Sequence, residues 1–258
     1  MKILFIGDVV GRGASEALCG FLPSFKRELE LGKGLVIVNG ENSADGNGIS
    51  PNSANLLFDA GADVITTGNH CFKRRDMDDM YRENSFVLRP ANYGSDAPGR
   101  GVCIIDRGNF SAAVINLAGI MFMTPADNPF NCVDTILKDI ETRNIIVDFH
   151  AEATAEKKAM GYYLSGRVSA VLGSHTHIQT ADEQIMDTHT AYITDVGMTG
   201  PHDSVLGVEK DIIIKRFLCY YPQKYILAEG THDINAVLIE IDEKSGKAKS
   251  IVRISKTM

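Results

Sequence analysis

Residues 2–42 read KILFIGDVVGRGASEALCGFLPSFKRELELGKGLVIVNGEN, and this stretch decides the fold. Two short apolar runs, Lys2–Ile6 and Leu35–Val38, enclose a longer amphipathic segment, Ser15–Glu30. Short runs rich in branched apolar residues are typical of buried strands, and a longer amphipathic segment between two of them is typical of a helix. The stretch therefore predicts a β-α-β unit, which places the chain in the α/β class.

The same alternation continues along the rest of the chain. The first half reads β-α-β-α-β-α, whereas the second half contains hairpin-like pairs of runs, so we expect a mixed sheet with helices over its outer faces. Ser50 before Pro51 is a helix start signal, because serine caps helices well and proline tolerates the first helical position. The further predicted strands are Asp63–Thr67, Val102–Asp106, Ala112–Leu117, Asn144–Phe149, Ala170–Leu172, Ala191–Thr194, Ala236–Ile241 and Ser250–Ile254. The further predicted helices are Pro51–Ala60, Arg75–Glu83, Val133–Thr142, Ala155–Leu164 and Glu209–Phe217. No linker rich in Pro, Gly or Ser interrupts the pattern, so we expect residues 1–258 to form a single domain.

Composition argues against several classes of protein. A formal net charge of −7 disfavours a broad nucleic-acid-binding surface, which neutralises phosphates with Lys and Arg, but a small anion held by metal stays compatible. The five cysteines include no CxxC pair and are odd in number, so neither a zinc ribbon nor a disulfide framework is indicated. The apolar N-terminal run is too short for a signal peptide, and no stretch approaches the length of a membrane span. We therefore expect a soluble, cytoplasmic protein with no membrane partner and no stable nucleic-acid complex.

Side chains that can bind metals follow five of the predicted strands. In an α/β sheet the carboxyl ends of the strands form the edge at which ligands bind, so five loops are expected to converge there. A glycine precedes several of these side chains and permits close approach of the backbone. The five clusters are Gly7-Asp8, Gly40-Glu41-Asn42, Gly68-Asn69-His70, Asp148-Phe149-His150 and Gly173-Ser174-His175-Thr176-His177.

The residue types in the clusters indicate transition-metal chemistry. Carboxylate oxygens and imidazole nitrogens suit zinc, manganese or iron, and the clusters contain no cysteine for a structural thiolate site. His175 and His177 would point to the same side if the preceding strand continued through them. One ion needs three or four ligands and the clusters offer more, so two ions are expected. Such ions lie about 3.5–4 Å apart and clamp the attacking and leaving oxygens of an in-line displacement.

Taken alone, each cluster also has a structural interpretation. Asp8 can cap a helix, and Glu41-Asn42 can belong to a turn, so it is the joint occurrence at five strand ends that favours a metal site. The glycine-rich residues 7–13 lack the Gly-Lys-Ser/Thr of a nucleotide-binding P-loop. Cys71 has no dedicated base and is interpreted as a packing residue, whereas Asp195 either lines the site or shapes a turn.

With these residues the chain resembles the calcineurin-like metallophosphoesterase superfamily. The hallmarks of that superfamily are an early Asp, a bridging carboxylate after a glycine, Gly-Asn-His, a lone His and Gly-His-x-His. More narrowly, the chain is similar over nearly its whole length to the YmdB family of bacterial 2′,3′-cyclic-nucleotide phosphodiesterases. The segments that carry the resemblance are residues 6–11 (IGDVVG), 39–42 (NGEN), 67–70 (TGNH), 88–92 (LRPAN), 148–154 (DFHAEAT), 173–182 (GSHTHIQTAD) and 194–201 (TDVGMTGP).

The resemblance implies a two-sheet mixed β-sandwich flanked by helices, in α-β-β-α layers. It also implies a division of the metal ligands: Asp8, Asn42 and His177 on one ion, Asn69, His150 and His175 on the other, and Glu41 bridging both.

The chain departs from the wider superfamily at Val10, where a His ligand is common, and at Glu41, where Asp usually bridges. The narrower family shares both departures, with Asn42 replacing the missing ligand. The chain departs from the narrower family at two places. At Gly119-Ile120 that family is expected to have Gly-Arg, and at Cys71-Phe72 it is expected to have a polar residue before the aromatic one. These two departures concern substrate anchoring rather than metal binding.

We therefore expect a dinuclear metal-dependent phosphodiesterase that hydrolyses 2′,3′-cyclic nucleotides. A hydroxide bridging the ions would attack phosphorus, and His70 would protonate the leaving ribose oxygen as general acid. Iron is the expected metal, as divalent or mixed-valence ions, with manganese or zinc as alternatives. The segment Gly119–Asn131 is expected to form a wall or lid near the nucleotide, with a plain surface excursion as the alternative.

Other functions stay open at this point. A phosphomonoesterase or a phosphoprotein phosphatase uses the same kind of dinuclear centre, and a regulator would bind a nucleotide and turn it over slowly. The complete ligand set and His70 favour an active enzyme. A homo-oligomer is compatible with the sequence. The identity of the native metals, the preferred base and the ribose oxygen that leaves are not specified by the sequence.

Overall fold

The two ends of the chain build one β-sheet, and its middle builds a second sheet that packs against the first. The computed structural model describes residues 1–45 and 47–258. The first sheet contains, in spatial order, β2 (Asp8–Val9), β11 (Met198–Pro201), β12 (His232–Ile241), β1 (Lys2–Ile6), β3 (Leu35–Asn39) and β4 (Val64–Thr66), with β13 (Ala248–Thr257) paired along β12. The second sheet contains β5 (Val102–Asp106), β6 (Ser111–Ala118), β7 (Ile145–His150), β8 (Ala170–Ser174), β10 (Thr190–Ile193) and β9 (Gln184–Met186).

Both sheets are mixed, as the sequence predicts. In the first sheet β1, β3 and β4 run parallel, whereas β12 is antiparallel to both β1 and β13. In the second sheet β6, β7, β8 and β10 run parallel, and β5 and β9 are antiparallel at the two edges. The parallel strands at the centre of each sheet bring their carboxyl ends to the same edge of the molecule.

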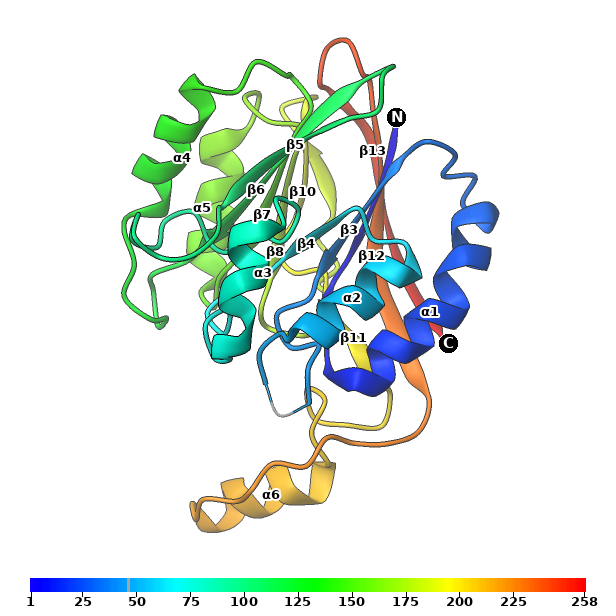
Figure 1. Cartoon of the computed structure of the whole chain (residues 1–258), viewed down its shortest axis with the longest axis vertical. Coiled ribbons are helices and arrows are strands. Elements are labelled where there is room, and N and C mark those ends of the chain that lie inside the picture. The colour runs from blue at the N-terminus through cyan, green and yellow to red at the C-terminus, as the bar shows by residue number, and fades with distance from the viewer. Residues whose placement is uncertain (46) are drawn as a thin grey trace.

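Three apolar layers hold the sandwich together. Inward-facing side chains of both sheets, such as Phe5 and Ile146, form the middle layer. Helices α1 (Gly11–Glu28) and α2 (Pro51–Ala60) cover the outer face of the first sheet, and α4 (Pro129–Lys138) and α5 (Thr154–Leu164) cover that of the second (Figure 1). The expected α-β-β-α layering is therefore confirmed.

Some element boundaries differ from the prediction. The short strands β2, β9 and β11 were not predicted, because two to four residues are too few to show an alternating pattern. Helix α4 begins at Pro129 rather than Val133, since the Asn128 side chain accepts hydrogen bonds from the N–H groups of Phe130 and Asn131. The predicted helix over residues 75–83 is a short 3-10 turn, Arg75–Met77, followed by α3 (Asp78–Glu83).

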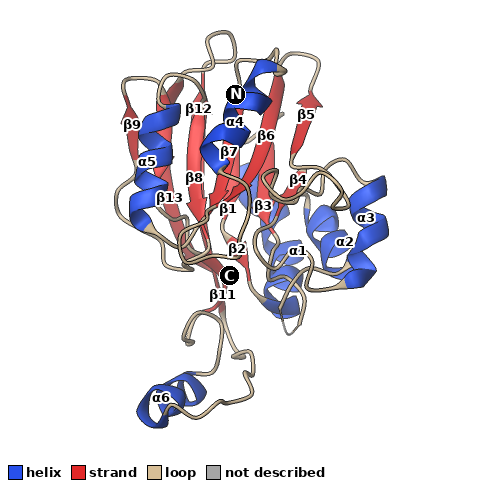
Figure 2. Cartoon of the chain, turned by 90° about the vertical axis from the view of Figure 1, so that its left-hand side faces the viewer, coloured by secondary structure: helices blue, strands red, loops and turns tan. Residues whose placement is uncertain are grey.

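Helix α6 (Lys210–Cys219) does not cover a sheet. It belongs to an arm, residues 202–231, that projects from the sandwich between β11 and β12 (Figure 2). None of the α6 residues is buried, so the expectation that helices cover the outer faces is wrong for this helix. The two ends of the arm meet where Pro201 pairs with His232. No helix in the described part of the chain combines the length and apolarity needed to cross a membrane.

Candidate metal centre

The five predicted clusters meet at the edge where both sheets present the carboxyl ends of their strands. Asp8, Glu41, Asn42, Asn69 and His70 come from the first sheet and the turns after its strands, and His150, His175 and His177 come from the ends of β7 and β8. One donor atom each of Glu41, His150 and His175 lies within 4.8 Å of the other two. The backbone N–H of His175 also donates to the Asp8 carboxylate at 3.1 Å, across 167 positions of the chain.

One group of side chains surrounds the Nε2 atom of His150. This nitrogen lies 3.0 Å from Nδ1 of His175 and 3.1 Å from Oδ1 of Asn69. A carboxylate oxygen of Glu41 lies 3.2 Å from the same nitrogen. Asn69, His150 and His175 are the three residues that the resemblance assigns to one ion.

A second group lies around Asp8. Nε2 of His177 is 3.4 Å from the Asn42 side-chain amide and 3.8 Å from Oδ1 of Asp8. The same Asp8 oxygen is also 3.8 Å from Nδ1 of His150, so the two groups adjoin. Asp8, Asn42 and His177 are the residues that the resemblance assigns to the other ion.

The atoms of the centre fit a bound cation. Oδ1 of Asp8 and both carboxylate oxygens of Glu41 are buried and make no well-directed hydrogen bond among the described residues, and the ring nitrogens of His70 and His150 lie 3.1 and 3.2 Å from Glu41. Nδ1 of His150 lies 2.9 Å from the Ser174 hydroxyl, which itself donates to Asp148, so Nδ1–H is the donor to Ser174 and the lone pair of Nε2 is available to a cation among the oxygens of Asn69 and Glu41. Buried acceptors that face one another are costly unless a cation or a proton lies between them. Carboxylate, amide and imidazole donors together suit zinc, manganese or iron.

The electrostatics of the centre favour positive charge. Burial lowers the pKa of His150, but Glu41, Asp8 and Asp148 outweigh burial and raise that pKa to about 9. Burial and the neighbouring His150 lower the pKa of His175 to about 3, so its imidazole is neutral and can act as a ligand. The negative field that favours a proton on His150 also favours a bound cation.

A buried hydrogen-bond relay orients His150. The Ser174 hydroxyl lies between the imidazole and Asp148, whose carboxylate it meets at 2.6 Å. Asn39 donates to Asp148 at 3.0 Å, and its own side-chain oxygen accepts from the Glu41 N–H group at 3.1 Å. Such partners fix the tautomer and orientation of a metal-binding histidine. Asn39 and Ser174 are not among the predicted site residues, although a polar residue directly after the apolar run Leu35–Val38 is a usable signal for Asn39.

The loop that carries His175 and His177 is not a continuation of β8. The strand ends at Ser174, and the backbone φ angles of His175 and His177 are 104° and 65°. The expectation that a continuing strand aligns the two histidines is therefore wrong, and the left-handed turns instead send each imidazole to a different group of ligands. Left-handed backbone is unfavourable for non-glycine residues, so surrounding contacts must hold it.

Asp195 supplies those contacts. Its carboxylate accepts hydrogen bonds from both the N–H and the hydroxyl of Thr176, the residue between the two histidines, at 2.9 and 2.8 Å. The Lys157 ammonium, which is 1% exposed, neutralises Asp195 at a distance of 2.6 Å. Asp195 therefore shapes the ligand loop, which decides between the two roles that its sequence position allowed.

His70 faces the centre with one ring nitrogen. Its Nδ1 lies 2.9 Å from Oδ1 of Asn42 and 3.1 Å from Oε1 of Glu41. The side chain is 23% exposed, more than Glu41 or His150, so it lies at the mouth of the centre. The next residue, Cys71, is fully buried, and burial raises the pKa of its thiol, which agrees with a packing role.

Gly68 is required by the closeness of the ligands. A Cβ atom at this position would lie 2.0 Å from the Glu41 carboxylate and 2.1 Å from the His150 ring. The predicted close approach after a glycine is thus confirmed here.

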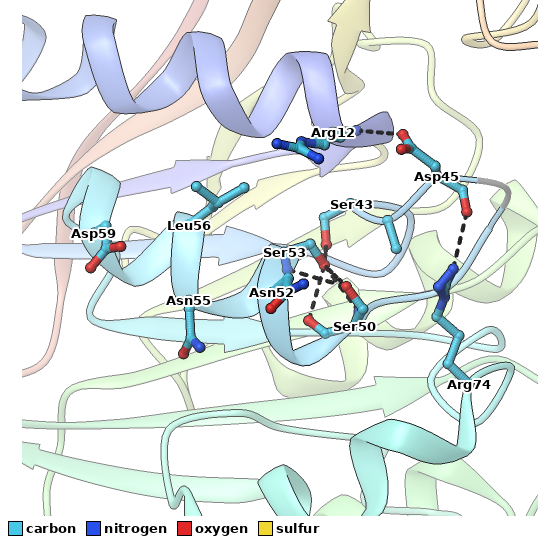
Figure 3. A pocket seen from close by; sticks show the side chains of 11 residues that line it. Arg12, Ser43, Asp45, Ser50, Asn52, Ser53, Asn55, Leu56, Asp59 and Arg74 are labelled. Atoms are coloured by element: carbon cyan, nitrogen blue, oxygen red, sulfur yellow. Dashed lines mark hydrogen bonds between the residues drawn. The ribbon is translucent and has the colours of Figure 1, made fainter.

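A polar hollow of about 380 Å³ lies next to the turn that carries Glu41 and Asn42, between the start of α1 and α2. In Figure 3 its floor is the hydrogen-bonded set of Ser43, Ser50 and Ser53, with Arg12 and Arg74 at its rim beside Asp45. Ser43 follows Asn42 directly and meets the Ser53 hydroxyl at 2.9 Å. None of the candidate metal ligands lines this hollow, so its network supports the turn of Glu41 and Asn42 from outside.

The segment after β6 starts beside the centre. Ala118, the last residue of β6, is in register with His150. The N–H groups of Ile120 and Met121 then donate to the Glu156 carboxylate, at 2.9 and 3.2 Å. The segment ends at Asn128 rather than Asn131 because α4 begins at Pro129.

Comparison with known proteins gives the chain a family. The family model described as YmdB-like protein matches residues 4–254. A 2′,3′-cyclic-nucleotide 2′-phosphodiesterase of Bacillus subtilis (strain 168) is 43% identical over 256 residues, covering 98% of this chain and 96% of that protein.

Solved structures agree with this result. A crystal structure of a novel phosphatase from Mycoplasma pneumoniae superposes with a TM-score of 0.93 at 30% identity, covering 100% of this chain and 93% of the other. An NAD nucleotidase of Haemophilus influenzae has a TM-score of 0.58 at 10% identity, covering 99% of this chain and 56% of its own, which shows a shared fold alone.

Proposed function

The chain belongs to the family of YmdB-like proteins, and from this premise we propose that it hydrolyses 2′,3′-cyclic nucleotides at the candidate metal centre. It is a phosphoric ester hydrolase, as its relatives named phosphodiesterase and phosphatase indicate. The name of the Bacillus subtilis relative supports the cyclic substrate. One structural observation carries the proposal: buried carboxylate oxygens of Asp8 and Glu41 converge with the imidazoles of His150 and His175 and make no well-directed hydrogen bond among the described residues.

The proposed ligands divide into two sets. Asp8, Asn42 and His177 would hold one ion, Asn69, His150 and His175 would hold the other, and the Glu41 carboxylate would serve both. When bound, two such ions supply a water nucleophile active near neutral pH and neutralise charge on the phosphoryl oxygens. Iron is the proposed metal, with manganese or zinc as alternatives.

The residues of the chain supply orientation and proton transfer. The relay from Asp148 through Ser174 fixes the ring of His150, and Asp195 fixes the loop of His175 and His177. His70, at the mouth of the centre, is the proposed general acid that protonates the leaving ribose oxygen.

A substrate panel tests the proposal. Protein with measured metal content is given 2′,3′-cyclic AMP, a linear diester, a phosphomonoester and a phosphopeptide. We expect the cyclic diester to be hydrolysed most efficiently. Efficient turnover of the monoester or the phosphopeptide without turnover of the cyclic diester would make the protein a phosphatase instead.

A pair of variants ties the activity to the centre. Asn42→Ala removes a proposed ligand, and Asn52→Ala removes an exposed amide in the polar hollow. The first change is expected to lower both metal content and turnover, and the second to leave both unchanged. Equal behaviour of the two variants contradicts the assignment of the site. A metal content that never exceeds one ion per chain in metal-replete buffer contradicts the dinuclear form.

A further inference from the structure

A second hollow is lined by aromatic and small residues, and two of them, Phe72 and Asn92, are connected to the metal centre. Its volume is about 580 Å³, which lies in the range of small-molecule sites. Phe72, Tyr93, Pro125 and Asp127 are among the residues that line it. We call it the aromatic hollow.

One wall of the aromatic hollow is tied to the metal centre through the turn after β4. Phe72 follows His70 by two residues, so their Cα atoms lie within about 7 Å of each other. The Phe72 ring is held edge-on by Tyr81, with ring centroids 5.7 Å apart and an interplanar angle of 70°. It also lies 6.2 Å from the ring of Tyr93. Despite these neighbours, the Phe72 side chain is 37% exposed.

A second part of the lining is connected to the metal centre through Asn92. The Asn92 side chain binds Ala118 through both its amide and its carbonyl oxygen, at 2.8 and 2.9 Å. Ala118 is in register with the candidate ligand His150 on the neighbouring strand. Asn92 also holds the backbone of Asp127, which fixes the 124–127 turn over the hollow. Both parts of the lining are therefore positioned by residues adjacent to candidate ligands.

The lining of the aromatic hollow fits a neutral, flat group rather than a second phosphate. No Lys or Arg is among its lining residues, and its single charged side chain is the carboxylate of Asp127. An anion would meet that negative charge without a compensating cation. The exposed ring of Phe72 instead offers a stacking surface, which every nucleobase can use.

We propose that the aromatic hollow binds the nucleobase of the substrate, stacked on Phe72, while the cyclic phosphate lies at the metal centre. This proposal rests on the proposed function and extends it to the part of the substrate that does not react. Stacking is tolerant of the base, and the Asn92 amide is already used by the backbone. The site therefore accepts purine and pyrimidine nucleotides with little discrimination.

The test compares a nucleotide with a substrate that lacks a base. Wild type, Phe72→Ala and Phe86→Ala are assayed with 2′,3′-cyclic AMP and with the 1,2-cyclic phosphate of glycerol. Phe86 is the matched control, because it is 39% exposed and does not line the aromatic hollow. Phe72→Ala is expected to raise KM for the nucleotide by about 5- to 150-fold, with a smaller change in kcat. The base-free substrate and the Phe86→Ala protein are expected to behave as in wild type.

A binding measurement makes the result independent of turnover. Adenosine, which has no phosphate, is titrated at millimolar concentration into each metal-loaded protein, and broadening of its base proton resonances in the nuclear magnetic resonance spectrum reports binding. We expect wild type and Phe72→Tyr to bind adenosine, and Phe72→Ala to lose this binding with unchanged metal content. If Phe72→Ala is depleted of metal, Phe72→Leu, which keeps apolar bulk and removes the ring, takes its place.

The outcomes separate this proposal from the proposed function. Wild type that hydrolyses both cyclic phosphates, with a nucleotide KM indifferent to Phe72, overturns the base site and leaves the proposed function intact. Wild type that hydrolyses neither substrate overturns the proposed function, and adenosine binding that depends on Phe72 then still supports the base site. Absence of adenosine binding to wild type overturns the proposed base site.

Discussion

His70 touches two candidate ligands through Nδ1, so its replacement tests whether proton transfer and metal binding are separable. We predict that His70→Ala retains both ions and slows hydrolysis of a ribose ester by about 10²- to 10⁴-fold, the usual contribution of a general acid. A diester with a nitrophenolate leaving group needs little protonation and is expected to lose much less. Metal analysis and the two rates provide the measurement. Equal losses with both leaving groups, together with depleted metal, would show that His70 only braces Asn42 and Glu41.

Lys157 and Asp195 form a buried pair whose disruption is expected to destabilise the fold. Lys157→Met leaves the carboxylate of Asp195, which is 0% exposed, without its cation. Breaking a buried pair in this way typically costs about 3–5 kcal/mol. The control is Lys158→Met, because Lys158 pairs with Asp182 at the surface, where such pairs contribute roughly 0–1 kcal/mol. Urea unfolding compares the two variants, and similar midpoints would contradict the importance of the buried pair.

At the scale of secondary-structure elements, the sequence predicted the strands and helices whose residues show a clear local pattern. The run Leu35–Val38 is apolar throughout and became the fully buried strand β3, and Ser50-Pro51 began α2 at the expected residue. The candidate ligands were visible because they follow such runs. Helix α4 was misplaced because the prediction began at Val133 and missed the cap formed by Asn128.

The remaining features depend on contacts between distant residues. Strand β2 exists because Asp8 and Val9 pair with Met198 and Thr199, which no local pattern encodes. The left-handed turns at His175 and His177 require Asp195 and Lys157, which lie on other elements. The aromatic hollow likewise joins segments that are about 50 residues apart in the sequence, so its lining could not be read from spacing.

Gly68 connects β4 to the ligand turn, and its lack of a side chain is predicted to be essential. Gly68→Ala would place a methyl group inside van der Waals distance of Glu41 and His150, and is expected to lower metal content sharply. Gly20→Ala in α1 is the control, since a Cβ there meets nothing within 4 Å and alanine favours helix. Elemental analysis of the two purified proteins measures their metal content. Full metal content in Gly68→Ala would contradict the geometry of the centre.

At the scale of the whole molecule, the candidate centre spans the two sheets. Glu41 belongs to the first sheet and His150 and His175 to the second, so a bound ion would link the halves of the sandwich. A ligand present at 100 times its Kd adds about 2.7 kcal/mol of stability, which corresponds to about 5–10 °C for a domain of this size. We predict a fall in Tm of this order when a chelator removes the ions. Glu41→Gln is the control, with a lower Tm that no longer responds to the chelator, and an equal response of both proteins would contradict the link.

The arm at residues 202–231 implies that the chain opens on two very different timescales. Helix α6 has no buried residue, and an isolated helix of ten residues is marginal in water, so its amides are expected to exchange with deuterium rapidly through local fraying. Strand β12, into which the arm returns, is hydrogen-bonded to β1 and β13 and is expected to exchange only when the sandwich unfolds. Hydrogen exchange followed by mass spectrometry resolves the two segments. Equal protection of α6 and β12 would mean that the arm is covered in solution.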